Sequence, residues 1–145
     1  HGELIAAFLW AQMEQSEHIL SKRLDIWNYY HDSFFELDKI DILRRPMTCI
    51  DGSHNGHMYY LLLPRLTDRD NFISNMKSNG IGCTFHYVPL HLSPFYASHF
   101  SSYLDKIDLP VTTSLSLRLV RLPLWIGVEN CLDLIIDSAK SVLLS

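Results

Sequence analysis

The chain has 145 residues, of which 48% are hydrophobic and 19% charged, and its formal net charge is −4. This length suits one domain with a packed core, and the apolar fraction excludes an intrinsically disordered chain. Only 12 lysines and arginines are present, and they are scattered. Because phosphate binding needs clustered cations, nucleic acid is not expected to be the main partner.

The cysteines and the apolar runs indicate the cellular context. Cys49, Cys83 and Cys131 are odd in number and form no CxxC motif, so neither a disulfide framework nor a zinc site is predicted. No apolar run is long enough to cross a bilayer, and the first residues lack the basic region and apolar core expected of a signal peptide. These features predict a cytoplasmic protein with reduced thiols. The chain begins with His1 rather than Met, and we expect it to be a piece of something longer.

The first 38 residues form the most regular segment. Residues 3–37 contain no proline or glycine, and apolar side chains recur every three or four residues. This spacing predicts one long helix, or two helices that meet at a kink near residues 15–17, with Ser16 as the N-cap of the second. The expected apolar face comprises Leu20, Leu24, Trp27, Tyr30 or His31, Phe34 and Leu37.

Residues 39–145 alternate between strand and helix patterns. The apolar run 57–63 ends at Pro64 and does not alternate, which predicts a strand covered on both faces. A helix should start at Thr67 and end at Asn79-Gly80, and a second strand should occupy residues 81–88. This order resembles a β–α–β unit.

The last third of the chain is less regular. Residues 90–110 favour a loop with a short helix, residues 112–120 another helix, and residues 121–125 an extended piece. Residues 128–144 have the spacing of an amphipathic helix. The predicted fold class is therefore α+β: a two-layer domain with a small mixed or antiparallel sheet covered by helices.

Eight histidines raise the question of a metal site. His54 and His57 are three residues apart, and His86 and His91 are five apart, with His99 beyond. No HExxH or Cys/His spacing accompanies them, so histidines that are hydrogen-bonded or solvated in loops are the favoured interpretation. No metal ligands are predicted.

Other catalytic patterns are weak. Ser53, His54 and Asp51 lack the strand–turn–helix context of a hydrolase nucleophile. Gly80 and Gly82 fit a helix-to-strand turn better than a phosphate loop. The five lysines lie in polar settings, whereas a Schiff-base lysine needs a desolvated pocket; they are Lys22, Lys39, Lys77, Lys106 and Lys140.

The densest polar and aromatic cluster is Thr84-Phe85-His86-Tyr87-Val88-Pro89-Leu90-His91. It follows a predicted strand, so its imidazoles and phenol would project from a rigid support and could bind a sugar or a phosphate. A strand end with satisfied polar side chains explains the composition equally well.

Four segments in order, 3–12, 57–60, 85–91 and 118–124, resemble the DegT/DnrJ/StrS family of PLP-dependent sugar-nucleotide aminotransferases. The closest resemblance is to the dTDP-4-dehydro-6-deoxy-D-glucose aminotransferases of enterobacterial common antigen and lipopolysaccharide biosynthesis. Two positions depart from the family pattern: Ile5 stands where glutamine is usual, and Gly2 where serine is commoner.

The resemblance implies that a large domain upstream holds pyridoxal phosphate (PLP) on a lysine and passes an amino group to a keto-sugar nucleotide. This chain would be the small C-terminal domain (residues 39–145) with the interdomain helix (residues 1–38). Alone it would bind no cofactor, have no catalytic residue and be inactive. The resemblance places His86, Tyr87 and His91 beside the nucleotide-sugar substrate, and a homodimer is expected.

Two alternatives stay open. The first is a free-standing α+β ligand-binding or interaction module without enzyme activity. The second is a metal-dependent hydrolase that uses the histidines listed above.

Overall fold

The computed structural model describes residues 2–48, 52, 54–64, 69–85, 87–100 and 108–145. Its elements in chain order are helices α1 (Glu3–Glu14), α2 (Ser16–Ser33) and α3 (Phe35–Lys39), strand β1 (Tyr59–Leu62), helix α4 (Arg69–Ser78), strand β2 (Thr84–Phe85), the 3-10 helix η1 (Leu90–Leu92), helices α5 (Pro94–His99) and α7 (Pro110–Ser116), strand β3 (Leu119–Leu122), the 3-10 helix η2 (Glu129–Cys131) and helix α8 (Leu132–Leu144).

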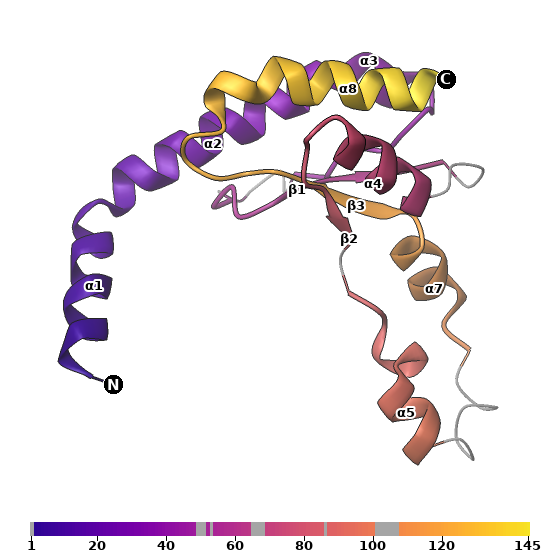
Figure 1. Ribbon diagram of the computed structural model, residues 1–145, viewed down its shortest axis with the longest axis horizontal. Coiled ribbons are helices and arrows are strands. Elements are labelled where there is room, and N and C mark those ends of the chain that lie inside the picture. Colours follow the sequence, from indigo (N-terminus) through magenta and orange to yellow (C-terminus); the bar gives the residue numbers. More distant parts are fainter. Residues whose placement is uncertain (1, 49–51, 53, 65–68, 86, 101–107) are drawn as a thin grey trace.

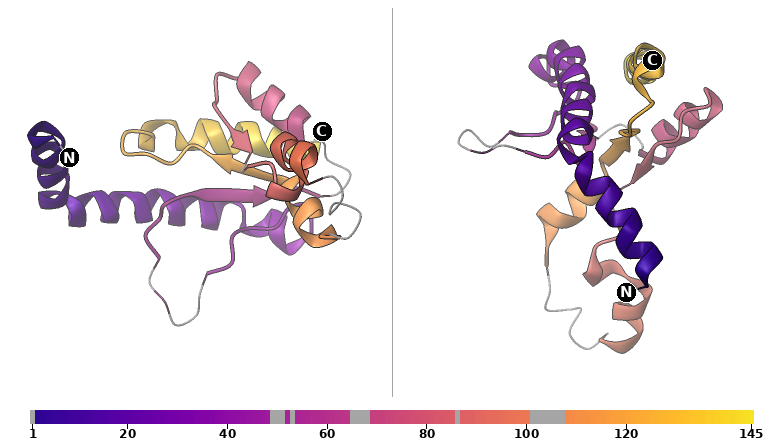
Figure 2. Two further views of the ribbon diagram at one scale, coloured as in Figure 1. Left: turned by 90° about the horizontal axis from the view of Figure 1, so that it is seen from below. Right: turned by 90° about the vertical axis from the view of Figure 1, so that its left-hand side faces the viewer.

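The predicted two-layer α+β architecture is confirmed. The three strands form an antiparallel sheet in the order β1-β3-β2, and helices α2, α8 and α4 lie side by side on one face of it (Figures 1 and 2). Helix α8 packs between the other two. Helix α1 turns away from α2 at one end of the molecule, and α5 and α7 extend beyond the strands at the other.

The predicted kink of the N-terminal helix is confirmed at Gln15, but Ser16 is not an N-cap. Gln15 occupies the cap position, and no side chain caps the amide groups there. The amide of Ile19 still donates to the carbonyl of Gln15 (2.9 Å), and the amide of Gln15 donates to Gln12 (3.2 Å). Because hydrogen bonding continues through the kink, α2 has no open N-terminus for a serine to cap.

A second interruption at Phe34 separates α2 from the short helix α3. The apolar face predicted from the 3.6-residue period nevertheless runs through it, since Trp27, Tyr30, Phe34 and Leu37 are all buried. Leu20, near the kink, is 40% exposed, so the buried stripe begins after it.

The core is rich in aromatic side chains whose polar atoms are bonded to backbone carbonyls. The hydroxyl of Tyr30 donates to the carbonyl of Pro123 (2.9 Å), and the indole of Trp27 donates to Met58 (3.2 Å). Burial raises the pKa of the Tyr30 phenol far above its ordinary value. These bonds satisfy the donors of the buried Tyr30 and Trp27 rings, whereas the buried hydroxyl of Tyr59 has no hydrogen-bond partner among the described residues.

The non-alternating run in β1 is covered on both faces as predicted. Tyr59 and Leu61 point to one face of the sheet and Leu62 to the other, and all three are buried. Strands β1 and β2 both run antiparallel to β3 and hence parallel to each other. The β–α–β interpretation is therefore correct in direction, but β3 lies between the two strands.

The prediction of a helix over residues 112–120 is wrong at both ends. Helix α7 starts at Pro110 and ends at Ser116, and Leu119 and Val120 belong to the central strand β3. Val120 is fully buried and pairs with Leu61 on one side and Phe85 on the other. Pairing on both edges decides the conformation here, although leucine-rich sequence favours a helix.

The second strand is shorter than the predicted 81–88, since β2 contains only Thr84 and Phe85. Tyr87 has a left-handed backbone (φ 53°), which ends the strand. The predicted helix stop at Asn79-Gly80 is confirmed, with Gly80 at φ 77° and the amide of Ile81 donating to Met76 (2.9 Å).

Thr67, the predicted N-cap of α4, lies outside the described residues. The short helix expected within residues 90–110 is present as η1 and α5. The C-terminal amphipathic helix is confirmed as α8, whose buried residues are Leu132, Ile135, Ile136 and Ala139. Within the described residues, no helix combines the length and apolarity needed to cross a membrane.

Leu132 and Leu134 make a matched test of this packing, because both lie on α8 but only Leu132 is buried, with Leu134 57% exposed. We expect Leu132→Ala to lower the free energy of unfolding by about 2–5 kcal/mol through lost burial and a residual cavity. Leu134→Ala should change it by no more than about 0.5 kcal/mol. Urea unfolding followed by circular dichroism measures both, and equal losses would contradict the orientation of α8.

Candidate functional site

The polar cluster after β2 leads out of the sheet into a projecting region that we call the arm, made of η1, α5 and α7 (Figure 1). The chain leaves β2 at Phe85 and enters η1 at Leu90. Of the three substrate-side candidates, Tyr87 and His91 are described, and His86 lies outside the described residues.

Tyr87 is 73% exposed and has a positive φ of 53°. A left-handed backbone costs a residue with a Cβ atom roughly 1–2 kcal/mol, so surrounding structure must hold it there. The phenol of Tyr87 is thus presented at the surface by a turn rather than by a regular strand.

His91 lies on η1 and is half-buried. Its Nε2 atom is 3.0 Å from the hydroxyl oxygen of Thr113 on α7. This hydrogen bond restricts rotation of the imidazole ring and joins η1 to α7.

A cavity of about 350 Å³ lies in the arm beside His91. Its walls are mainly apolar, with the imidazole, a phenol and a hydroxyl among them; the lining residues are Pro89, Leu90, His91, Tyr96, Leu109 and Thr112. Apolar walls with a few polar groups are typical of small-molecule sites.

Tyr96 was not among the candidates from sequence. It lies in the first turn of α5, where its amide donates to the hydroxyl of Ser93 (3.2 Å). Ser93 followed by Pro94 is an N-cap signature, so the sequence did contain a signal for this helix. It contained none for the cavity.

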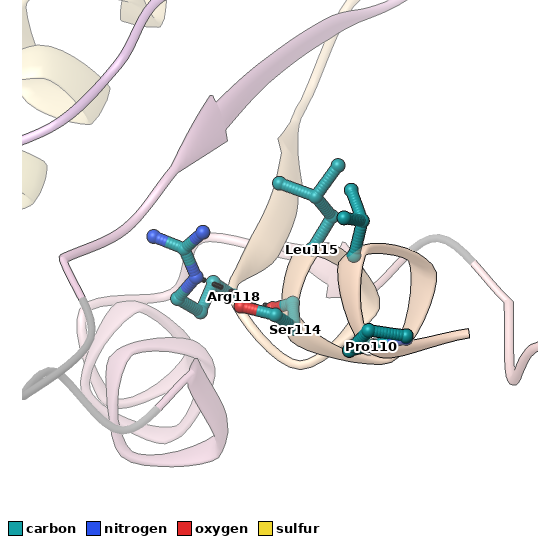
Figure 3. Close-up of a pocket in the computed structure, with 5 residues that line it drawn as sticks. Pro110, Ser114, Leu115 and Arg118 are labelled. Atoms are coloured by element: carbon teal, nitrogen blue, oxygen red, sulfur yellow. Dashed lines mark hydrogen bonds between the residues drawn. The ribbon is translucent and has the colours of Figure 1, made fainter. Parts of the chain in front are cut away.

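A second cavity of about 250 Å³ lies between α7 and the start of β3 (Figure 3). Its one cationic lining residue, Arg118, donates from Nε to the carbonyl of Ser114 (3.2 Å) and from a terminal nitrogen to Leu63 (3.3 Å). Arg118 therefore contributes to the connection between α7 and the end of β1.

Two histidines pack on Trp27 rather than gather around a metal. The ring of His31 stacks on the indole at 4.6 Å, and that of His54 lies at 4.3 Å. Nδ1 of His54 accepts a hydrogen bond from the amide of Gly56 (3.2 Å). In the described part of the chain, no three His, Cys, Asp or Glu side chains form a metal-binding group.

Two further hypotheses fall partly outside the described residues. Asp51 and Ser53, the proposed partners of His54 in a hydrolase, are among the residues without a description. Of the cysteines, Cys83 and Cys131 are free thiols, and burial raises the pKa of Cys83 to about 12. Cys49 is not described.

The four described lysines lie outside the two cavities of this region. Lys22, Lys39 and Lys77 are exposed, and Lys140 is half-buried on α8. None of the four lines the cavities beside His91 or Arg118. Lys106 lies outside the described residues. A lysine that forms a Schiff base needs a desolvated pocket, which none of the four described lysines has in these two cavities.

The arrangement of sheet, covering helices and preceding long helix is that of a domain found in aminotransferase structures. The chain belongs to the DegT/DnrJ/EryC1/StrS aminotransferase family, whose sequence model matches residues 2–136. Aminotransferases of this family bind PLP, and a PLP-form structure occurs among the structural neighbours.

Three relatives illustrate the match. The spore coat polysaccharide biosynthesis protein SpsC of Bacillus subtilis is 25% identical over 145 residues, which are 97% of this chain and 36% of SpsC. DesV of S. venezuelae, in complex with a ketimine intermediate, is 25% identical with a TM-score of 0.79, covering 97% of this chain and 36% of DesV.

The third is PseC of Helicobacter pylori, an aminotransferase involved in pseudoaminic acid biosynthesis. It is 15% identical with a TM-score of 0.80, over 93% of this chain and 35% of PseC. The chain thus spans about a third of the length of the relatives that it matches.

His31 generates a test of pH dependence. Burial, and then the charge of Arg45, lower its pKa from the ordinary value of 6.5, and its buried Nδ1 has no hydrogen-bond partner among the described residues. Below that ordinary value the unfolded chain takes up a proton that the folded chain resists. We therefore expect the free energy of unfolding to fall as the pH is lowered from about 7.5 to about 5.5.

His31→Phe keeps a ring on Trp27 and removes the titration, so its stability should vary less with pH than that of the parent chain. His18→Phe makes the same change at an exposed position of α2 and controls for the added aromatic ring. Urea unfolding at the two pH values measures both. Equal slopes for His31→Phe and the parent would contradict the assignment.

Proposed function

We propose that this chain is the C-terminal part of a PLP-dependent aminotransferase that transfers an amino group to a nucleotide-linked keto-deoxysugar for cell-surface polysaccharide synthesis. The specific activity proposed is that of a dTDP-4-dehydro-6-deoxy-D-glucose aminotransferase, as in enterobacterial common antigen or lipopolysaccharide biosynthesis. The carrying observation is the family match over residues 2–136.

The division of labour follows from the side chains present. PLP supplies the carrier for the amino group when it is bound, and its lysine is assigned here to the part of the longer protein outside this chain. The described lysines, none of which lines a cavity of the arm, support that assignment. The chain's own role is substrate binding, with residues 1–38 as the interdomain helix and residues 39–145 as the small domain.

The substrate-binding residues proposed are His86, Tyr87 and His91. Imidazole and phenol groups donate and accept hydrogen bonds, which suits sugar hydroxyls and a diphosphate. The exposure of Tyr87 and the position of His91 at a cavity of the arm support this role. The names of SpsC and PseC, which concern polysaccharide and pseudoaminic acid biosynthesis, support a sugar substrate.

We further propose that the longer protein is a cytoplasmic homodimer. Helix α1 supports the dimer, because none of its residues is buried and its large apolar side chains are exposed. A helix that is apolar on all sides is normally covered by protein. The alternative, a free-standing ligand-binding or interaction module, predicts that this chain binds its ligand or partner without any lysine-bearing domain.

The substrate role is tested in the whole protein encoded by the reading frame that contains this chain, loaded with PLP and supplied with an amino donor. Tyr87→Phe should raise the KM for the nucleotide keto-sugar roughly 3- to 10-fold, since it removes one neutral hydrogen bond. Formation of the amino sugar is followed by mass spectrometry. The half-reaction with the amino donor should keep its rate.

Tyr29→Phe is the matched control, because Tyr29 is an exposed tyrosine on α2 that bonds Asp133 on α8, and neither helix belongs to the arm. Its KM should equal that of the parent protein. An active parent protein whose KM is the same with Tyr87→Phe contradicts the role of Tyr87, and a protein that aminates no nucleotide sugar contradicts the function itself.

The exposed face of α1 predicts how the isolated chain behaves in solution. Leu4, Phe8 and Trp10 are 87%, 71% and 65% exposed, and apolar patches of this kind tend to associate. We expect a dimer or larger species in analytical ultracentrifugation, and Phe8→Glu should shift it toward monomer. Leu134→Glu, on α8, should not, and a monomeric parent chain at high concentration would contradict the prediction.

A further inference from the structure

Residues 84–91, which carry the proposed substrate contacts and which we call the substrate-side segment, are linked to helix α7 near both ends of the segment. Near the upstream end, Arg69 of α4 contacts both Phe85 and the carbonyl of Ser116. At the downstream end, His91 contacts the hydroxyl of Thr113. Residues 84–91, which carry the proposed substrate contacts, are thus attached to one helix at two points.

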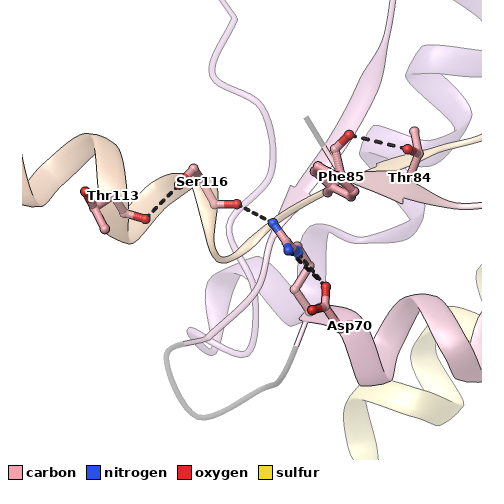
Figure 4. A network of polar contacts seen from close by, with 6 residues as sticks. Asp70, Thr84, Phe85, Thr113 and Ser116 are labelled. Atoms are coloured by element: carbon pink, nitrogen blue, oxygen red, sulfur yellow. Dashed lines mark hydrogen bonds and ion pairs between the residues drawn. The ribbon is translucent and has the colours of Figure 1, made fainter. Parts of the chain in front are cut away.

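The upstream contact involves the N–H groups of one guanidinium and one of its faces (Figure 4). Arg69 donates to the carbonyl of Ser116 at 2.8 Å and pairs with Asp70 at 2.9 Å, and its central carbon lies 4.7 Å from the centre of the Phe85 ring. The arginine side chain is 15% exposed, whereas Asp70 is 73% and Phe85 43% exposed, so water screens the ion pair with Asp70. The planar guanidinium can stack on the Phe85 ring while its N–H groups donate to the Ser116 carbonyl. The compact ammonium of a lysine cannot make both contacts in this geometry.

Both contacts reach helix α7. The hydroxyl of Ser116 donates to the carbonyl of Thr113 at 2.9 Å, one turn back along the helix (Figure 4). Thr113 in turn lies 3.0 Å from Nε2 of His91. The two attachments are therefore three residues apart on the same short helix.

This segment needs such attachments because regular structure does not hold it. Strand β2 has only two residues, and Tyr87 two residues later has a left-handed backbone. A displacement of about 1 Å at a binding side chain is enough to weaken a hydrogen bond to substrate severely.

We propose that Arg69 and Thr113 are positioning residues that hold Tyr87 and His91 in the geometry that binds the nucleotide sugar. This proposal rests on the function proposed above. Neither residue is assigned a contact with substrate: Arg69 acts through Phe85 and α7, and Thr113 acts through His91.

The first test is the series Thr113→Val, Thr113→Ser and Ser116→Ala in the PLP-loaded whole protein. Valine keeps the shape of threonine and removes the hydroxyl, so the KM for the nucleotide keto-sugar should rise roughly 3- to 10-fold. Thr113→Ser should restore it. The rate with the amino donor should not change in any variant.

Ser116→Ala is the control for a general loosening of α7, because it removes the bond to Thr113 and leaves the backbone carbonyl that Arg69 uses. Its KM should stay within about twofold of the parent value, as expected for a partly exposed side chain. Urea unfolding confirms that each variant is folded before its kinetics are compared.

The second test addresses Arg69 through its partner ring. Phe85→Tyr keeps an aromatic ring under the guanidinium and should keep the KM. Phe85→Leu and Arg69→Lys, each as a single substitution, should raise the KM. A third measurement is nuclear magnetic resonance of the imidazole nitrogens of His91 in this chain, whose chemical shifts should change with Thr113→Val and return with Thr113→Ser.

The outcomes separate the two proposals. A whole protein that aminates the sugar with the same KM in Thr113→Val and Phe85→Leu overturns the positioning role alone. Unchanged His91 shifts in Thr113→Val also overturn it. A folded, PLP-loaded whole protein that aminates no nucleotide sugar overturns the proposed function, and the substrate part of this inference with it.

Discussion

The packing of helix α2 onto strand β1 is the contact on which the rest of the structure depends. The rings of Tyr30 and Tyr59 lie 5.2 Å apart and those of Phe34 and Tyr59 6.3 Å apart, and all three side chains are fully buried. The Tyr30 hydroxyl extends this contact to the carbonyl of Pro123, directly after β3. One aromatic cluster therefore joins the long helix to β1 and to the residue after β3, next to the face of the sheet that α8 and α4 cover (Figure 1).

The same arrangement leaves two regions outside the core. Helix α1 lies beyond the kink at Gln15 and buries no residue, and the arm lies beyond the strands. The arm therefore depends on a few polar contacts rather than on apolar burial, with Arg69 and Thr113 central among them. Loosely packed elements of this kind are where binding surfaces are commonly located.

Local sequence pattern predicted the structure correctly wherever the conformation favoured by neighbouring residues was also the one that packs in the core. The 3.6-residue period identified α2 and α8, and the stop at Gly80 ended α4 where expected. Pattern failed at Leu119 and Val120, because leucine-rich sequence suits a helix and only pairing with β1 and β2 makes it a strand. The prediction of Ser16 as an N-cap was wrong because helical hydrogen bonding continues through Gln15, where the two helices meet.

The sequence by itself determined the α+β class and the long N-terminal helix and, through its motifs, indicated the family and the candidates His86, Tyr87 and His91. Only the tertiary structure decided the strand order, the cavity with Tyr96, and the contacts that join Phe85 and His91 to α7. The physical reason is distance along the chain: periodicity and caps act within a turn or two, whereas His91 meets Thr113 across 22 residues and Arg69 meets Ser116 across 47. Such contacts form only when the whole core brings their elements together.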